Sequence, residues 1–164
     1  MKIAIYPGSF DPITKGHLDV LKTSAEIFDK IIIAVSKNSN KNSFLTVEER
    51  LQLIKASVAG MENVEVDSFE GLTVEYAKLR GAKVLIRGLR AVSDFEYEMQ
   101  LSQTNSALLE DIKTVFLITK PKYNFISSST VKDVSLLGGD ISKFVPEPVN
   151  DFLIKRREQN IKQT

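Results

Sequence analysis

Short runs of apolar and β-branched residues recur along the chain, and segments of helical pattern separate them. Five runs are typical of strands: Ile3–Tyr6, Ile31–Val35, Val64–Val66, Val84–Ile86 and Val115–Ile118. Most are continuously apolar instead of alternating, which is typical of strands buried on both faces of a parallel sheet. We therefore expect a five-stranded parallel sheet with helices on both sides.

Apolar residues at helical spacing follow the first two strands: Leu18, Leu21, Ala25 and Phe28, then Val47, Leu51, Ile54 and Val58. Thr46 and Glu49 have the spacing of a capping box, so the second of these helices should begin just after Thr46. Two more helices are predicted over Val74–Leu79 and Ser93–Leu109. The alternation of strand and helix predicts a Rossmann-like, doubly wound α/β fold with right-handed crossovers.

The last third of the chain has a different pattern. A serine-rich stretch, Ser127–Ser129, precedes a short helix that ends at Gly138 and Gly139. Pro146 and Pro148 then precede a terminal helix, whose polar end we expect to fray. The 164 residues have the size of one domain, so we interpret residues 1–164 as a single domain with a C-terminal helical extension.

Composition excludes several classes of protein. The 22 Lys and Arg nearly balance the 21 Asp and Glu, which argues against a nucleic-acid or anionic-membrane binder. With no cysteine and a single histidine, His17, the chain has no thiol nucleophile, disulfide or histidine-rich metal site. It has no apolar run long enough to span a membrane and no signal-peptide pattern, so we expect a cytoplasmic protein without a membrane partner.

Polar segments follow the predicted strands, where ligands bind in doubly wound sheets: Pro7–His17, Ser36–Lys41, Gly71–Thr73, Arg87–Arg90 and Tyr123–Ser129. Glycine before a helix, with His17 at its start, is typical of a phosphate site, although neither the dinucleotide fingerprint nor a Walker A loop is present. Arg87 and Arg90 suit bidentate phosphate binding, but a surface pair bridging to Asp94 or Glu96 remains an alternative. The serines before the short helix fit an anion site or a plain helix cap.

Several motifs together carry a resemblance. Thr14-Lys15-Gly16-His17, after Gly8-Ser9-Phe10-Asp11-Pro12, is similar to the T-x-G-H form of the nucleotidylyltransferase signature. The order and spacing of the remaining motifs resemble the bacterial phosphopantetheine adenylyltransferase family across essentially the whole chain: Arg87-Gly88-Leu89-Arg90, Asp94-Phe95-Glu96-Tyr97-Glu98, Phe125-Ile126-Ser127-Ser128-Ser129 and Phe144-Val145-Pro146. The wider superfamily has histidine where Thr14 stands, and threonine is this family's own variant.

The resemblance implies transfer of the adenylyl group of ATP to 4′-phosphopantetheine, giving dephospho-coenzyme A and pyrophosphate in coenzyme A biosynthesis. A phosphate monoester is largely ionised at neutral pH, so this nucleophile needs no general base. The enzyme must instead position the phosphates and neutralise their charge. The resemblance assigns His17 to stabilising the transition state.

The resemblance also assigns binding residues. The ATP-binding residues are Ser9, Phe10, His17, Gly88, Leu89, Arg90, Glu98, Tyr123, Asn124, Phe125, Ile126, Ser127, Ser128 and Ser129. The residues for the phosphopantetheine side are Ser9, Lys41, Thr73 and Arg87. Magnesium is expected to arrive with ATP, with no protein side chain predicted as its ligand. The family further implies a homohexamer and feedback by coenzyme A.

Two alternatives stay open from the residues alone. The chain could be another nucleotidylyltransferase, with a nucleotide acceptor such as nicotinate mononucleotide or a cytidylyl donor. It could also be an ATP-binding regulatory domain, which would bind ATP without releasing pyrophosphate. Pyrophosphate release with a panel of phosphorylated acceptors distinguishes the three.

Overall fold

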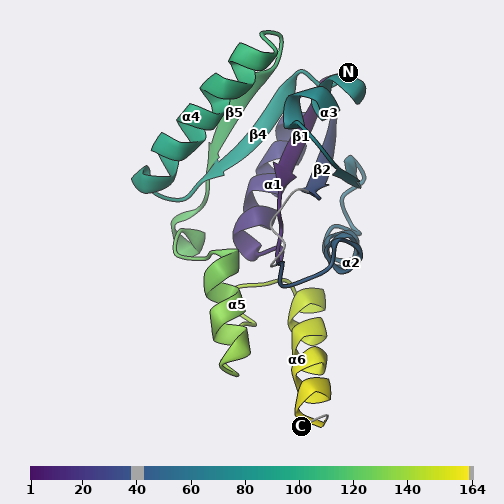
Figure 1. Ribbon diagram of the computed structural model, residues 1–164, viewed down its shortest axis with the longest axis vertical. Coiled ribbons are helices and arrows are strands. Elements are labelled where there is room, and N and C mark those ends of the chain that lie inside the picture. The colour runs from purple at the N-terminus through teal and green to yellow at the C-terminus, as the bar shows by residue number, and fades with distance from the viewer. Residues whose placement is uncertain (38–42, 163–164) are drawn as a thin grey trace.

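A twisted parallel sheet lies between two layers of helices in the computed structural model, which describes residues 1–37 and 43–162 (Figure 1). Its strands follow the order β3-β2-β1-β4-β5, and every neighbouring pair is parallel. The strands are β1 (Ile3–Gly8), β2 (Lys30–Ser36), β3 (Val64–Phe69), β4 (Val84–Leu89) and β5 (Lys113–Ile118). The predicted doubly wound, Rossmann-like sheet is confirmed.

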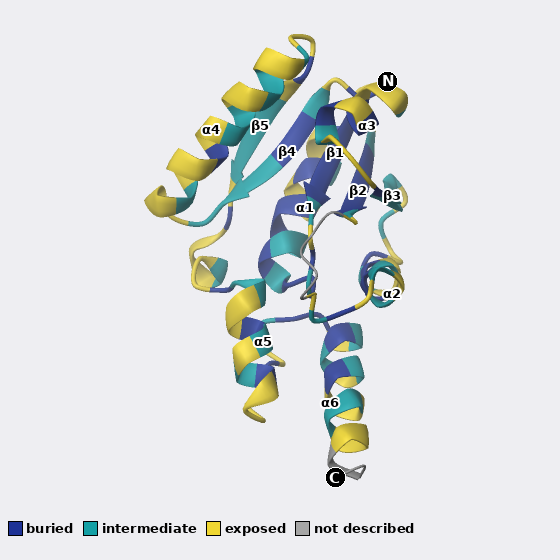
Figure 2. Ribbon diagram, viewed as in Figure 1, coloured by how far each residue is buried: buried dark blue, intermediate teal, exposed yellow. Residues whose placement is uncertain are grey.

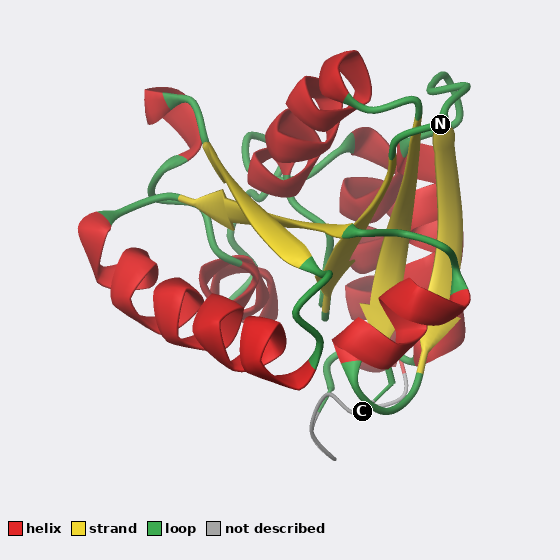
Figure 3. Ribbon diagram, turned by 90° about the horizontal axis from the view of Figure 1, so that it is seen from above, coloured by secondary structure: helices red, strands yellow, loops and turns green. Residues whose placement is uncertain are grey.

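The helices divide between the two faces of the sheet, as Figure 3 shows. One face packs against α1 (Lys15–Ile27) and α2 (Val47–Ser57). α5 (Ser128–Leu136) and α6 (Glu147–Lys162) lie beyond the carboxyl ends of the strands (Figure 1) and contribute to the same apolar cluster. The other face is covered by α3 (Thr73–Leu79) and α4 (Val92–Leu108), and a 3₁₀ turn, η1 (Pro121–Tyr123), follows β5. None of the helices in the described part of the chain is both long and apolar enough to cross a membrane.

Burial follows the position of a strand in the sheet more than its sequence (Figure 2). The inner residues of β1 and β2 are buried, whereas β5 has no buried residue and β3 buries only Phe69. An edge strand has a neighbour on one side only and less helix cover. The expected burial on both faces therefore holds for the central strands and not for the edges.

The helix ends follow local sequence signals. At α2, Thr46 Oγ1 accepts a hydrogen bond from the Glu49 N–H at 3.1 Å, and Glu49 Oε2 accepts one from the Thr46 N–H at 2.8 Å. This confirms the predicted capping box. Pro148 lies inside the first turn of α6 and not before the helix, because the first N–H groups of a helix need no intrahelical partner.

β1 and β4 separate toward their carboxyl ends. Their paired positions are Ala4 with Val84 and Ile5 with Leu85, after which β1 stays paired only with β2 and β4 only with β5. A Cβ on Gly88 would lie 2.9 Å from Val20 Cγ2, so glycine lets β4 pass close to α1 here. The order of the sheet reverses between these two strands, which places a crevice at their ends.

Candidate active site

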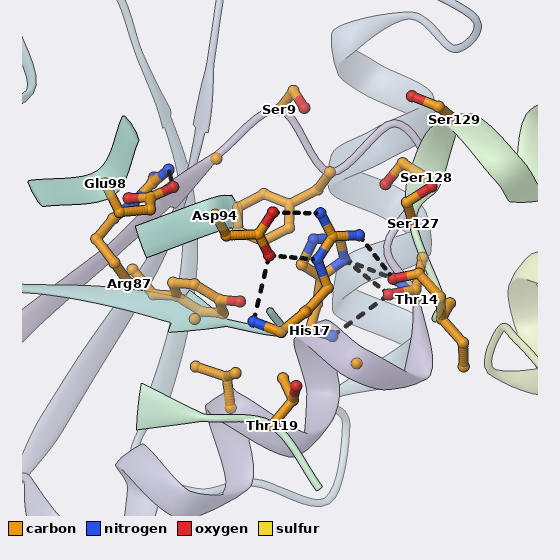
Figure 4. A pocket seen from close by; sticks show the side chains of 18 of the residues that line it. Ser9, Thr14, His17, Arg87, Asp94, Glu98, Thr119, Ser127, Ser128 and Ser129 are labelled. Carbon is orange, nitrogen blue, oxygen red and sulfur yellow. Dashed lines mark hydrogen bonds and ion pairs between the residues drawn. The ribbon is translucent and has the colours of Figure 1, made fainter. Parts of the chain in front are cut away.

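A cavity of about 470 Å³ opens at the carboxyl ends of β1 and β4 (Figure 4). Its walls come from the loop after β1, the start of α1, the end of β4, the first half of α4 and the start of α5. Three of the five predicted polar segments therefore meet: Pro7–His17, Arg87–Arg90 and the end of Tyr123–Ser129. This is the switch point at which such sheets bind ligands.

His17 lies on the first turn of α1 and is held by Thr14, the residue that caps this helix. The Thr14 N–H donates to His17 Nδ1 at 3.0 Å, while Thr14 Oγ1 accepts from the His17 N–H at 3.3 Å. Since Nδ1 accepts a backbone hydrogen bond, the neutral ring carries its proton on Nε2. The T-x-G-H motif thus acts as a capping box in which histidine takes the usual place of glutamate.

The surroundings keep His17 neutral. Desolvation by the surrounding protein, followed by the positive charges of Arg90 and Arg87, lowers the pKa of His17 from 6.5 to about 4. The Phe10 ring packs edge-on against the imidazole, with the ring centroids 5.1 Å apart. At neutral pH the side chain is therefore a hydrogen-bond donor through Nε2 and not a cation.

The loop before α1 is fixed from outside the cavity. Arg50 is buried on α2, and its Nη1 donates to the Ser9 carbonyl at 2.9 Å. The two carboxylate oxygens of Asp11 accept hydrogen bonds from the Phe44 and Leu45 N–H groups at 2.7 and 2.8 Å. These contacts hold the Ser9 backbone at the wall of the cavity.

The backbone of that loop is unusual at Phe10, and the place of the Phe10 ring depends on Gly8. Phe10 has a φ of +46°, which is uncommon for a residue with a side chain. A Cβ on Gly8 would lie 2.9 Å from the Phe10 ring, so only glycine leaves room for the ring to fold back. The phenyl ring thereby lies against the His17 imidazole and lines the cavity with it.

Arg87 is held in a bidentate ion pair. Its Nε and Nη2 donate to the two Glu98 carboxylate oxygens, each at 2.6 Å, and its Nη1 donates to the Pro7 carbonyl at 3.0 Å. Burial acts against the charge on Arg87, but the hydrogen bonds and charge of Glu98 outweigh it and raise the pKa of the guanidinium. Arg87 therefore remains a cation at the wall of the cavity.

Arg90 connects three segments. Its Nε and Nη2 donate to the Asp94 carboxylate at 3.1 and 3.2 Å, its backbone N–H donates to Asp94 Oδ2 at 3.2 Å, and its Nη1 donates to the Ile126 carbonyl at 3.0 Å. The alternative raised from the sequence, a bridge to Asp94, is thus present. It lies in the cavity wall and not on an open surface.

The serine-rich stretch forms the opposite wall. Ser127 caps α5 by accepting the Thr130 N–H at 3.0 Å, and Ser128 Oγ donates to the Pro12 carbonyl at 2.8 Å. Both line the cavity together with Ser129. The sequence left two alternatives for these serines, a helix cap and an anion site. The two are compatible, since the N–H groups at a helix N-terminus attract anions.

Most of the predicted site residues meet at the cavity, namely Ser9, Phe10, His17, Arg87, Gly88, Arg90, Glu98, Ile126, Ser127, Ser128 and Ser129. Five others are not among its lining residues: Thr73, which opens α3, Leu89, which ends β4, and Tyr123, Asn124 and Phe125, which precede Ile126. Lys41 lies outside the described residues.

Several residues that line the cavity were not predicted as ligand contacts, among them Tyr6, Thr14, Asp94, Tyr97 and Thr119. One signal was available: Asp94 and Glu98 are four residues apart on a predicted helix that directly follows two arginines. Thr119 gave no such signal, because only the position of β5 beside β4 brings it to the cavity.

Residues 5–134 match the family model described as cytidylyltransferase-like. The phosphopantetheine adenylyltransferase of Lachnoclostridium phytofermentans is 56% identical over 149 residues, which cover 91% of each chain. That of Alkaliphilus metalliredigens is 51% identical over 156 residues, which cover 95% of this chain and 99% of the relative. The chain belongs to the phosphopantetheine adenylyltransferase family.

Membership of the phosphopantetheine adenylyltransferase family confirms the resemblance drawn from the motifs. The chain is also similar to the solved structure of a Vibrio parahaemolyticus protein described as a candidate nicotinate-nucleotide adenylyltransferase. The two share a TM-score of 0.71 at 20% identity, over 94% of this chain and 99% of the other. At that identity the likeness shows a common fold and carries no information on the acceptor.

Proposed function

We propose that this chain is an enzyme that transfers the adenylyl group of ATP to 4′-phosphopantetheine, giving dephospho-coenzyme A and pyrophosphate. The observation that carries this is sequence similarity: relatives named for that activity have the same residue at more than half of the aligned positions, and the alignments cover nine-tenths of this chain. The T-x-G-H histidine at the wall of the cavity supports it, because the family motif and the switch point of the sheet coincide. The reaction belongs to coenzyme A biosynthesis.

The chemistry needs positioning more than acid–base catalysis. An oxygen of the phosphopantetheine phosphate forms a bond to the α-phosphorus of ATP, and the bond to the bridging oxygen breaks with its electron pair leaving on pyrophosphate. The nucleophile is already ionised near neutral pH, so no proton has to be removed. What remains is stabilising the charge on the crowded α-phosphate.

The proposed role of His17 is to donate from Nε2–H to an α-phosphate oxygen in the transition state. Its low pKa supports this, because a neutral donor aimed by a fixed cap does not have to reorganise during the reaction. Around it, the other ATP contacts proposed are Ser9, Phe10, Gly88–Arg90 and residues 123–129, and those proposed for phosphopantetheine are Ser9, Lys41, Thr73 and Arg87.

We propose that magnesium enters with ATP. Mg²⁺ prefers oxygen ligands and keeps several waters. The carboxylates nearest the cavity, Asp94 and Glu98, already accept hydrogen bonds from arginines, and the described residues contain no group of three acidic or histidine side chains suited to a metal. Phosphate oxygens and water are therefore its proposed ligands, and bound there the ion would neutralise phosphate charge.

The assembly is proposed to be a homohexamer located in the cytoplasm and subject to feedback by coenzyme A. Exposed apolar side chains along α4, including Val92, Tyr97 and Leu108, support contact with another subunit. Light scattering should give the mass of six chains, and a monomer mass would rule the hexamer out. Added coenzyme A should lower turnover, and unchanged turnover would rule out the feedback.

The decisive experiment is a coupled assay of pyrophosphate release with ATP and a panel of acceptors. We expect release with 4′-phosphopantetheine and none with nicotinate mononucleotide or with ATP alone. Release with a nucleotide acceptor only would assign the chain to a different nucleotidylyltransferase. ATP binding without release on any acceptor would indicate a regulatory domain.

A further inference from the structure

α4 differs from the other helices that cover the sheet. Of its 17 residues only Glu98 is buried, although the helix carries several apolar side chains. Asp94 and Glu98 stand one turn apart, so they share a face, and both line the cavity (Figure 4). The face that α4 turns toward the site is therefore acidic, in a place where the proposed substrates are anions.

Each of these carboxylates holds a different arginine. Glu98 accepts from Arg87 through both oxygens at 2.6 Å, and Asp94 accepts from Arg90 through both oxygens at 3.1 and 3.2 Å. The arginines flank Gly88 and Leu89 at the end of β4, so the two pairs lie side by side in sequence and in space.

The pairing leaves each guanidinium able to bind a further anion. A guanidinium has five N–H donors. Arg87 uses three of them, two on Glu98 and one on the Pro7 carbonyl. Arg90 likewise uses two on Asp94 and one on the Ile126 carbonyl. Within residues 1–37 and 43–162, two donors per arginine are left without a partner, the number that a bidentate phosphate contact requires.

We propose that Glu98 and Asp94 are positioning residues: Glu98 orients Arg87 for the phosphopantetheine phosphate, and Asp94 orients Arg90 for the phosphates of ATP. An arginine side chain has about 2 kcal/mol of rotamer entropy, and holding it in place beforehand reduces the cost of binding. This inference rests on the proposed function for the identity of the two ligands. It gives Glu98 a role through Arg87 in place of a direct adenosine contact.

The test measures the two Michaelis constants separately in two conservative variants. Glu98→Gln should raise the KM for phosphopantetheine roughly tenfold, which corresponds to about 1.4 kcal/mol, and change the KM for ATP less than twofold. Asp94→Asn should do the reverse. Glu96→Gln, an exposed carboxylate on the same helix, is the matched control and should change neither.

The opposite pattern overturns the proposal. If Glu98→Gln raises the KM for ATP alone, Glu98 contacts the nucleotide directly. If either variant raises the KM values for both substrates equally, the carboxylates support the fold and do not position one arginine each. Glu98→Asp keeps the charge and should recover part of the lost affinity; no recovery, with an unchanged melting temperature, also counts against positioning.

A double-mutant cycle tests the route through Arg87. If Glu98 acts only by orienting Arg87, adding Glu98→Gln to Arg87→Ala should leave the KM for phosphopantetheine where Arg87→Ala alone puts it. Additive losses would show a separate role for Glu98 and overturn the proposal.

Calorimetric titration with ATP alone separates this inference from the proposed function. Asp94→Asn should weaken ATP binding, and Glu98→Gln and Glu96→Gln should not, whether or not the wild-type protein turns over phosphopantetheine. Wild-type pyrophosphate release decides the function, and the contrast between the variants decides the positioning. Equal ATP affinity in Asp94→Asn and the wild type would refute the role of Asp94.

Discussion

Two clusters among the described residues bring cationic side chains and carboxylates together, and one of them lines the cavity at the ends of β1 and β4. Beside β3, Arg80, which caps the end of α3, pairs with Glu65 and Asp67. Lys30 of β2 also binds Glu65, and the Tyr76 hydroxyl donates to Asp67 at 2.6 Å. At the end of β4, Arg87 and Arg90 pair with Glu98 and Asp94. Each cluster has two cations and two carboxylates, so charge alone does not distinguish them.

Their surroundings do distinguish them. The Glu65 and Asp67 side chains are 37% exposed, whereas Glu98 is 11% exposed, so water screens the first cluster more. The second cluster also faces the His17 ring, the three serines before and within α5 and the N-terminal turn of that helix. An ion pair therefore indicates a ligand-binding site only where other hydrogen-bond donors line the same cavity.

The titration of His17 gives the largest expected effect. Because the Arg87 and Arg90 cluster adds to burial, His17 should titrate near pH 4 in the folded chain, with a proton affinity roughly three-hundredfold below that of a free histidine. The unfolded chain takes up this proton near pH 6.5. The contribution of the buried, neutral His17 to the free energy of unfolding is therefore complete above pH 6.5 and is lost as the pH falls toward 4. NMR of the single imidazole measures the midpoint directly.

Two variants extend this titration. Arg90→Ala removes a nearby positive charge and should raise the midpoint, whereas Arg80→Met, in the other cluster, should leave it unchanged. A wild-type midpoint at or above 6.5 would contradict the neutral-donor role. A response to Arg80→Met would contradict the separation of the two clusters.

Removal of the His17 side chain comes next. His17→Ala should lower kcat by ~10²-fold or more while ATP affinity changes much less, because the donor acts mainly on the transition state. Steady-state kinetics and calorimetry measure the two effects. His17→Gln keeps an acceptor within reach of the Thr14 N–H and controls for loss of the helix cap. Equal losses in kcat and ATP affinity in His17→Ala would instead make His17 a ground-state ligand.

The smallest expected effect is in the exposed cluster. Arg80→Met should lower the free energy of unfolding by about 1 kcal/mol, because partly exposed pairs contribute little, and should leave kcat and both KM values within twofold of the wild type. Urea denaturation and the pyrophosphate assay measure these. A loss of activity comparable to that of the cavity variants would show that the two clusters are coupled.

How much the sequence predicted depends on the range of the interaction. The capping box at Thr46 and Glu49 could be predicted because its partners lie within one helical turn. The strands were recognised from their apolar runs, but the low burial of β5 was not, because its position at the edge follows from the order of the sheet. The pattern around Arg50 gave no indication that its side chain is buried against the Ser9 carbonyl, 41 residues away.

The sequence by itself determined the fold class, the family motifs and the position of the single histidine at a helix start, since these depend on local periodicity and on residue types in a fixed order. The tertiary structure alone decided which carboxylate holds which arginine, and that Arg87 and Arg90 contribute to keeping His17 neutral. The physical reason is the strand order: with β1 beside β4, the ends of two distant segments share one desolvated crevice, where each charge acts on the others.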